Sequence, residues 1–237
     1  MITIGILMCG HAPAALVAQH GDYDDMFISL LADEDFAFRT WAVVDGELPP
    51  DIHAADGWLL TGSRHAVYED HAWLPPLEDF LRAAYGAAVP IVGICFGHQV
   101  LAHALGGRVE KFVGGWSVGR VEYRVDGPSG HASDGEAATH LLAFHQDQVV
   151  AAPPAARVTG ATPFCRYAFL DYGERAMSMQ PHPEFTDAFV QDLLTARADV
   201  LPPALLEEAR AQAGEALDAA RIAASIRAFY RRAAASC

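Results

Sequence analysis

The sequence contains few cysteines, comparatively few basic residues and no long apolar run. Its four cysteines (Cys9, Cys95, Cys165 and Cys237) form no C-x-x-C pair, which argues against a zinc knuckle or a disulfide framework and favours a reducing compartment. Sixteen Lys and Arg stand against thirty Asp and Glu, and the resulting formal charge of −14 repels phosphate backbones and anionic lipids. No apolar stretch reaches the ~20 residues that span a bilayer. We therefore expect neither nucleic-acid nor membrane binding.

Motifs that would indicate other classes of protein are also missing. The first ten residues, MITIGILMCG, contain no basic segment, so we expect no signal peptide and a cytoplasmic location. The nucleotide-binding pattern G-x-x-x-x-G-K-[ST] does not occur. Histidines such as His11, His65, His71 and His131 fall in no ligand pattern of the H-E-x-x-H kind, so we predict no metal and no cofactor.

The first half of the chain alternates compact apolar runs with segments of helical spacing. A hydrophobic content of 52% in 237 residues is enough for a sizeable core. The expected strands are 2–8, 36–44, 57–61 and 89–95, and the expected helices are 23–31 (behind Asp22 as N-cap), 75–85 and 97–105. This order predicts an α/β layered fold with a mostly parallel central sheet and flanking helices.

From Val118 onward the pattern changes to short alternating runs separated by Gly, Pro and Asp. These runs predict antiparallel or mixed strands, forming a smaller sheet on the same core. A helix is expected over 186–197, and an Ala-rich helical tail over 203–232. We predict one main domain over 1–197 and a helical extension over 198–237 that packs on it. The apolar stripe of the tail is compatible both with covering the sheet and with pairing to a second subunit.

The strongest chemical signal is Gly93-Ile94-Cys95-Phe96-Gly97-His98-Gln99, between a buried strand and a helix. A sharp turn there presents the Cys95 thiol at the carboxyl edge of the sheet, where ligands bind in open α/β folds. Glycine at positions 93 and 97 removes Cβ atoms that would collide with the neighbouring backbone. The helix N-terminus favours a thiolate and supplies N–H groups for an oxyanion. The competing interpretation is an ordinary buried cysteine.

A second signal is Gln180-Pro181-His182-Pro183-Glu184, after an apolar strand over 176–179. Two prolines restrict the backbone around His182, which is a candidate base for the Cys95 proton. Glu184 can accept a hydrogen bond from the other ring nitrogen and fix its tautomer. Taken alone, His182 is equally compatible with a turn histidine beside a surface carboxylate.

Together, the two motifs closely resemble the class I glutamine amidotransferases, which are Cys-His-Glu hydrolases. The order of Cys95 and His182, and their separation of nearly ninety residues, also agree with that family. The resemblance covers roughly residues 40 to 190. It implies the flavodoxin-like architecture of these enzymes, with Cys95, His182 and Glu184 as the catalytic triad.

The resemblance also implies roles for residues outside the triad. The turn Thr61-Gly62-Ser63 resembles the family's glycine turn, so that the N–H groups of Gly62 and Phe96 would form the oxyanion hole. Gln99 would hold the α-carboxylate or α-amino end of the substrate. The segment from His145 to Val149 matches the His-x-Asp-x-Val pattern that lines the glutamine pocket. The substrate-binding candidates are Ser63, Gln99, Gln146 and Asp147.

The implied reaction is hydrolysis of the γ-amide of glutamine or of a γ-glutamyl compound, through a thioester on Cys95. Two alternatives stay open. In the first, the chain is a glutaminase subunit that delivers ammonia to a separate synthase chain. In the second, it is a binding module that kept the turn for packing. A small-molecule substrate is expected in either enzyme, and the sequence does not decide whether the chain forms a homo-oligomer.

Overall fold

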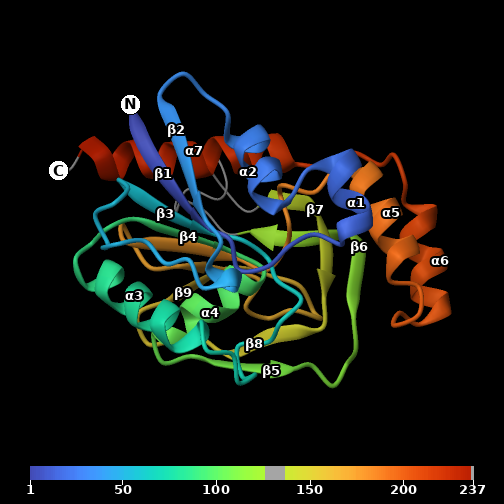
Figure 1. Ribbon diagram of the computed structural model, residues 1–237. Helices are drawn as coiled ribbons and strands as arrows, with labels where there is room; N and C mark the ends of the chain where they lie inside the picture. The colour runs from blue at the N-terminus through green and yellow to red at the C-terminus, as the bar shows by residue number, and fades with distance from the viewer. Residues whose placement is uncertain (126–136, 236–237) are drawn as a thin grey trace.

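The computed structural model describes residues 1–125 and 137–235, so His131 and Cys237 lie outside it. Figure 1 shows a large twisted sheet with helices on both faces. The sheet has nine strands in the order β2-β1-β3-β4-β11-β10-β9-β6-β7, and a separate two-stranded sheet pairs β5 with β8. The predicted α/β layered fold is therefore the observed one. In the described residues, no helix combines the length and apolar character needed to cross a bilayer.

One half of the large sheet is parallel and buried. Its strands, in spatial order, are β2 (Phe36–Trp41), β1 (Ile2–Leu7), β3 (Gly57–Leu60), β4 (Ile91–Ile94) and β11 (Ala176–Met179). Every residue of β3, β4 and β11 is buried, as expected for apolar strands covered on both faces. Because these strands run in the same direction, their carboxyl ends meet at one edge of the sheet.

The other half of the sheet is antiparallel. It contains β10 (Phe169–Asp171), β9 (Arg157–Ala161), β6 (Ser117–Val125) and β7 (Ala137–His145). The predicted smaller sheet consists only of β5 (Arg108–Lys111) and β8 (Asp147–Ala151). Most of the alternating runs after Val118 thus extend the central sheet instead of forming a second one. The reason is that β10 pairs directly with β11, which continues the hydrogen-bonded ladder of the parallel half.

Helices cover both faces of this sheet (Figure 1). Helix α3 (Leu74–Gly86) and helix α4 (Phe96–Ala104) contribute to one apolar core. Helix α2 (Tyr23–Leu31) and helix α7 (Ala219–Ala235) contribute to the core on the opposite face. A third cluster joins the remaining helices to the β6–β7 pair. These remaining helices are α1 (Ala14–His20), α5 (Asp187–Ala196) and α6 (Pro203–Ala211), and a short 3-10 turn, η1, spans Val43–Asp45.

The C-terminal tail differs from the continuous helical segment expected over 203–232. Helices α6 and α7 are separated by residues 212–218, where Gly214 has a φ of 79°. The stripe residues Ile222, Ile226 and Phe229 are buried against the chain's own sheet. Intramolecular packing therefore accounts for the α7 part of the apolar stripe, and the homo-oligomer stays a prediction.

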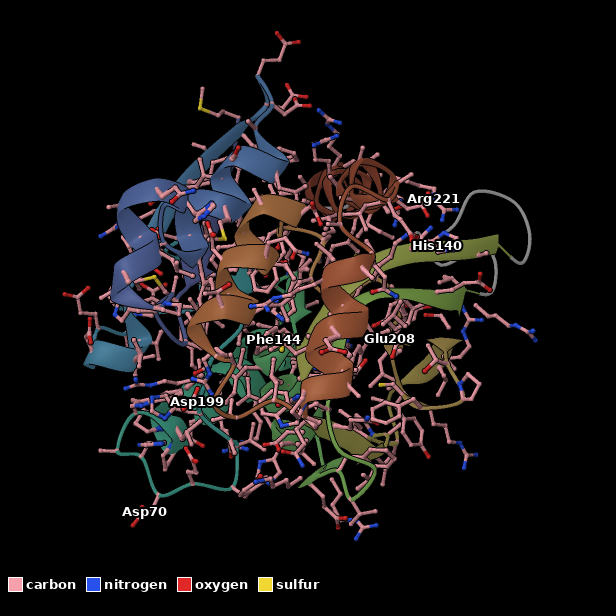
Figure 2. The ribbon with its side chains drawn as sticks, turned by 90° about the vertical axis from the view of Figure 1, so that its right-hand side faces the viewer. Asp70, His140, Phe144, Asp199, Glu208 and Arg221 are labelled. Atoms are coloured by element: carbon pink, nitrogen blue, oxygen red, sulfur yellow. The ribbon has the colours of Figure 1, made fainter. Side chains whose placement is uncertain are left out.

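Polar contacts attach the start of α7 to strand β7, where Figure 2 labels His140 and Arg221. The backbone N–H of His140 donates to Asp218 Oδ2 at 2.7 Å, and Arg221 donates to Thr139 Oγ1 at 2.6 Å. Farther along α7, the Tyr230 hydroxyl donates to the Trp58 carbonyl at 2.8 Å. These contacts connect the tail with both halves of the sheet.

Candidate active site

Cys95 lies at the turn between β4 and α4, as the sequence predicts. Its φ of 53° and ψ of −103° are unusual for a residue with a side chain, and such strain persists only where the surrounding structure imposes it. An ideal Cβ at Gly93 would lie 2.6 Å from the Gly97 carbonyl oxygen, and one at Gly97 would lie 2.5 Å from that of Leu60. Glycine is therefore required on both sides of the cysteine.

His182 follows β11 and is held in place by three contacts. Its backbone N–H donates to the Leu142 carbonyl at 2.8 Å, and its Nδ1 lies 2.7 Å from Glu184 Oε1. Its ring stacks on Phe185, with centroids 3.9 Å apart and planes inclined by 4°. The remaining ring nitrogen, Nε2, is buried without a hydrogen-bond partner among the described residues. Glu184 thus orients the ring and leaves Nε2 available for chemistry.

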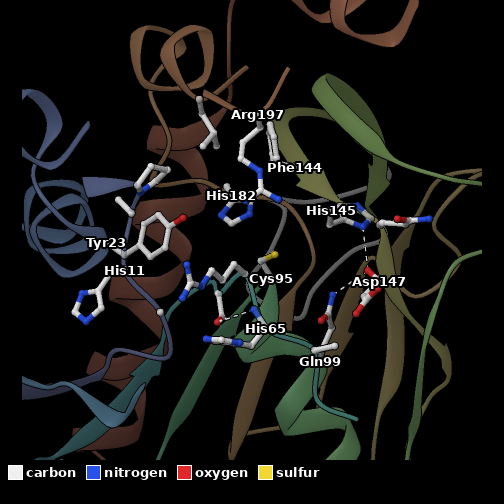
Figure 3. A pocket seen from close by; sticks show the side chains of 18 of the residues that line it. His11, Tyr23, His65, Cys95, Gln99, Phe144, His145, Asp147, His182 and Arg197 are labelled. Carbon is white, nitrogen blue, oxygen red and sulfur yellow. Dashed lines mark hydrogen bonds between the residues drawn. The ribbon is translucent and has the colours of Figure 1, made fainter. Parts of the chain in front are cut away.

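The Cys95 thiol and the His182 ring face the same cavity (Figure 3). Burial lowers the pKa of His182, but the Cys95 thiolate and the Glu184 carboxylate outweigh burial and raise that pKa from 6.5 to about 10. Nearby anions favour the protonated ring. This arrangement can therefore hold a thiolate–imidazolium pair, with a nucleophile and a proton donor in one place.

The cavity has a volume of about 680 Å³ and is lined by Cys95, Ser63, Gln99, Gln146, Asp147 and His182, among others. It thus brings together six of the residues that the sequence predicts for the site. The predicted oxyanion residues adjoin it. An ideal Cβ at Gly62 would lie 3.0 Å from His182 Cε1 and 3.8 Å from Cys95 Cβ, and Phe96 begins the helix after Cys95.

Gln99 and Gln180 form a chain of side-chain amides that ends at the thiol. Gln99 Nε2 donates to the Asp147 carbonyl at 2.9 Å and to Gln180 Oε1 at 3.1 Å. Gln180 Nε2 in turn lies 3.5 Å from Cys95 Sγ. The Gln99 amide N–H groups are thereby used within the protein, which leaves Oε1 as the group for a ligand. Gln180 was not among the predicted site residues, although it opens the motif that contains His182.

Asp147 lies in the same cavity, across from His182 (Figure 3). Its Oδ2 accepts a hydrogen bond from the Tyr68 hydroxyl at 2.9 Å. Burial raises the pKa of Asp147, while the Tyr68 hydrogen bond and the Lys111 charge oppose this rise. Lys111 also lines the cavity, so this end presents a carboxylate and an ammonium group together.

The other two predicted substrate-binding residues, Ser63 and Gln146, already contact backbone groups. Ser63 Oγ lies 3.1 Å from the backbone nitrogen of His65, and Gln146 Nε2 lies 3.4 Å from the Phe112 carbonyl oxygen.

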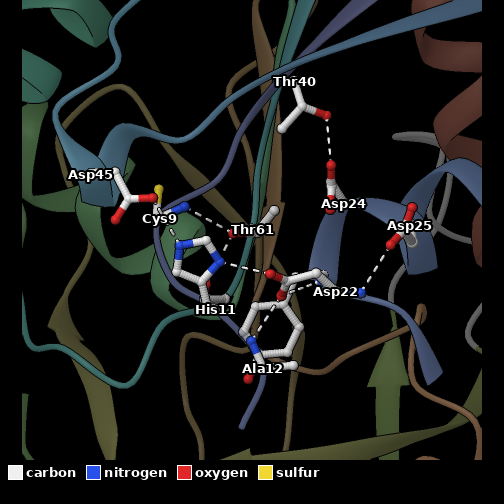
Figure 4. A network of polar contacts seen from close by, with 11 residues as sticks. Cys9, His11, Ala12, Asp22, Asp24, Asp25, Thr40, Asp45 and Thr61 are labelled. Carbon is white, nitrogen blue, oxygen red and sulfur yellow. Dashed lines mark hydrogen bonds and ion pairs between the residues drawn. The ribbon is translucent and has the colours of Figure 1, made fainter. Parts of the chain in front are cut away.

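A polar network fixes the segment after β1 at the rim of the cavity (Figure 4). His11 contacts Asp22 Oδ2 at 2.6 Å and Asp45 Oδ2 at 3.1 Å. The hydrogen bond to Asp22 raises the pKa of His11. Asp22 is also the predicted N-cap of α2 and forms a capping box with Asp25. Cys9 beside this network is fully buried in the apolar core, and burial raises the pKa of its thiol.

His65, Glu69 and His71 bring one potential metal ligand atom each to within 4.8 Å of one another. Glu69 Oε2 lies 3.3 Å from His65 Nδ1 and 2.8 Å from His71 Nε2. No metal was predicted from the sequence, because His65 and His71 fall in no known ligand spacing. The Glu69 carboxylate thus lies between the two imidazoles, and the absence of a metal stays a prediction.

A family model for class-I glutamine amidotransferases matches residues 47–191, more than half of the chain. The chain belongs to this family. Among its relatives, γ-glutamyl peptidase 4 of Arabidopsis thaliana is 28% identical over 182 residues, which cover 74% of this chain and 72% of the relative. The glutamine-hydrolysing GMP synthase of Parafrankia sp. (strain EAN1pec) is 40% identical over 128 residues, which cover 53% of this chain and 23% of that protein.

Among solved structures, a glutamine amidotransferase of Methylobacillus flagellatus superposes with a TM-score of 0.76. The match covers 98% of this chain and 94% of that one at 18% sequence identity, so it establishes the class I amidotransferase fold. The chain is therefore a member of an enzyme family whose named relatives act in glutamine and γ-glutamyl chemistry.

Proposed function

We propose that this amidotransferase hydrolyses the γ-amide bond of glutamine or of a γ-glutamyl compound, through a γ-glutamyl thioester on Cys95. The Cys95 thiolate attacks the amide carbon and forms the C–S bond. Protonated His182 gives its proton to the departing nitrogen as the C–N bond breaks. The now neutral His182 then takes a proton from water, which attacks the thioester and releases glutamate and the thiolate.

The backbone N–H groups of Gly62 and Phe96 stabilise the oxyanion of each tetrahedral intermediate. Both groups lie beside Cys95, and neither has an acceptor among the hydrogen bonds of the described residues. Backbone donors fixed before the charge develops need no reorganisation during the reaction. The loss of one such donor typically costs ~100-fold or more in rate.

The α-amino acid end of the substrate binds at the opposite end of the cavity from His182. The free Gln99 Oε1 and the Asp147 carboxylate suit an α-ammonium group, while Lys111 suits the α-carboxylate. Ser63 and Gln146 complete the wall at this end. The placement of both charges there supports a zwitterionic substrate.

The observation that carries the proposal is the grouping of Cys95, His182 and Glu184, with a strained cysteine backbone and a free imidazole nitrogen facing one cavity. Replacement of Cys95 by Ala should abolish hydrolysis of glutamine and of γ-glutamyl dipeptides, because no other group there can form the thioester. Steady-state kinetics on both substrates measure this, with circular dichroism to confirm folding. Hydrolysis by Cys95→Ala at the parent rate would contradict the proposal.

A diazo-ketone analogue of glutamine tests the proposal without turnover. We expect the reagent to label Cys95, and mass spectrometry of tryptic peptides would locate the adduct. Cys9 and Cys165 serve as internal controls because, unlike Cys95, neither is among the residues that line the cavity. A binding module without catalytic chemistry would leave Cys95 unlabelled.

A second candidate function is ammonia delivery to a separate synthase chain, and the similarity to glutamine-hydrolysing GMP synthases favours it. The matched region is 23% of the Parafrankia protein. In this case, glutamine would be hydrolysed faster than γ-glutamyl dipeptides, and a partner chain in cell extract would raise that rate. Parallel assays with and without extract separate the two functions.

A further inference from the structure

Arg197 is a pocket residue that the proposed reaction leaves without a role. It follows α5 directly and lines the same cavity as Cys95 and His182. Its Nε is buried and has no hydrogen-bond partner among the described residues. Figure 3 shows the side chain pointing into the cavity from the side of His182 and Phe144.

Arg197 differs from several arginines of this acidic protein, which pair with carboxylates. Thirty acidic residues are available for sixteen basic ones, and Arg82, Arg157 and Arg231 each contact a carboxylate. Within residues 1–125 and 137–235, Arg197 contacts none. Partial burial of a guanidinium without an anion is unfavourable, so the structure leaves a place for an anion supplied from outside.

The position of Arg197 relative to the reacting groups indicates which part of a substrate carries that anion. His182 gives its proton to the leaving nitrogen, so the leaving group lies on the His182 side of Cys95. Arg197 is on this side, whereas Asp147 and Gln99 lie across the cavity (Figure 3). Tyr23 also lines the cavity, and burial and the Cys95 charge raise the pKa of its hydroxyl while the Arg197 charge lowers it.

The charged side chains that line the cavity favour a substrate with more charged groups than glutamine. Lys111 and Asp147 already provide one positive and one negative charge for the α-amino acid end. The leaving group of glutamine is ammonia, which carries no anion for Arg197. A leaving amino acid or peptide carries its carboxylate one or more residues beyond the scissile nitrogen, and one residue spans about 3.5 Å of extended chain.

We infer that Arg197 forms a leaving-group subsite that binds the carboxylate of γ-glutamyl dipeptides and related γ-glutamyl peptides. The inference rests on the proposed function and narrows its substrate class. The guanidinium fork matches a carboxylate in two-point geometry. Arg197 holds the leaving group so that its nitrogen stays near His182 Nε2 when the C–N bond breaks. The neighbouring aromatic pair Phe144 and Trp116, with ring centroids 5.8 Å apart, provides an apolar wall for the rest of the leaving group.

The test compares two substrates that share the γ-glutamyl group. γ-Glutamylglycine has a carboxylate in its leaving group, and γ-glutamylethylamide lacks it. The parent enzyme should favour γ-glutamylglycine in kcat/KM by about 10- to 100-fold, the usual value of hydrogen bonds between charged groups. Arg197→Gln should remove most of this preference, and Arg197→Lys should retain part of it, since the charge remains but the fork is lost.

Arg64→Gln is the matched control, because Arg64 lines the same cavity but is exposed and follows the Gly62 turn. It should leave the preference between the two substrates unchanged. A parent enzyme without preference for γ-glutamylglycine would overturn the inference, and so would an Arg197→Gln enzyme that slows both substrates equally. Absence of any Cys95-dependent hydrolysis would instead overturn the proposed function, so the two failures are distinguishable. The comparison of the two substrates with the parent enzyme needs no variant. It therefore tests the inference even if Arg197→Gln does not fold.

Discussion

At the scale of single residues, His182 depends on two anions on opposite sides of its ring. Glu184 Oε1 lies 2.7 Å from Nδ1, and the Cys95 thiolate is the first of the two causes that raise the pKa of the ring above 6.5. Burial alone would lower this pKa and release the proton needed by the leaving group. The carboxylate therefore orients the imidazole and also keeps it protonated near neutral pH.

Replacement of Glu184 by Gln tests this account. The pKa of His182 is raised in part by Glu184, so the neutral amide should let the ring lose its proton at a lower pH. We expect the alkaline limb of the kcat/KM profile to move to lower pH and the rate at neutral pH to fall by about 100-fold or more, as for other orienting carboxylates. Glu208→Gln, on the exposed surface of α6, should leave the profile unchanged. If the alkaline limb of the Glu184→Gln profile stays at the parent's pH, the role of Glu184 in keeping His182 protonated is contradicted.

At the scale of elements, the turn from β4 to α4 decides where the thiol lies. Both flanking glycines pack against backbone atoms that cannot move without displacing a strand or the helix. The local sequence was sufficient to predict this turn, because the requirement for glycine is steric.

Two other elements, strand β5 and helix α1, were not predicted from the sequence. β5 has only Val109 buried, and α1 has no side-chain cap, so neither segment carries a strong local signal.

Two glycine substitutions test whether the backbone is closely packed at the turn after Cys95. Gly97→Ala places a Cβ 2.5 Å from the Leu60 carbonyl oxygen, and such overpacking should lower the free energy of unfolding by ~1–3 kcal/mol and suppress activity. Gly86→Ala, at the end of α3, meets no atom within 4 Å and should raise that free energy by about 0.4–1 kcal/mol. Urea denaturation measures both. Equal effects of the two substitutions would show that the turn is not tightly packed.

At the scale of the whole molecule, the buried histidines make folding sensitive to acid. His98 Nδ1 forms a hydrogen bond with Ser178 Oγ at 2.7 Å, and His145 Nδ1 lies 3.1 Å from the Asp147 carbonyl oxygen. Burial lowers the pKa of each ring to about 3. Below pH 6.5 the unfolded chain binds protons at these positions while the folded protein does not, so acid favours unfolding.

The free energy of unfolding should therefore fall as the pH decreases from 6.5 toward 4. Each buried histidine contributes a slope of about 1.4 kcal/mol per pH unit. His98→Asn should reduce the total slope by that amount, measured by urea denaturation at several pH values. His53→Gln is the control because His53 is exposed, and it should leave the slope unchanged. A slope in His98→Asn equal to that of the parent would show that His98 is protonated in the folded state.

The sequence by itself determined the alternating strands and helices, the turn at Cys95 and the family motif around His182. These features depend on local causes, namely hydrophobic period, glycine sterics and the chemistry of adjacent residues. Only the tertiary structure decided that the late strands extend the central sheet, that residues 212–218 interrupt the tail and that Gln180 reaches the thiol. It also placed Arg197 in the same cavity as Cys95 and His182. Strand partners and pocket neighbours depend on contacts between residues far apart in the chain, which no local pattern specifies.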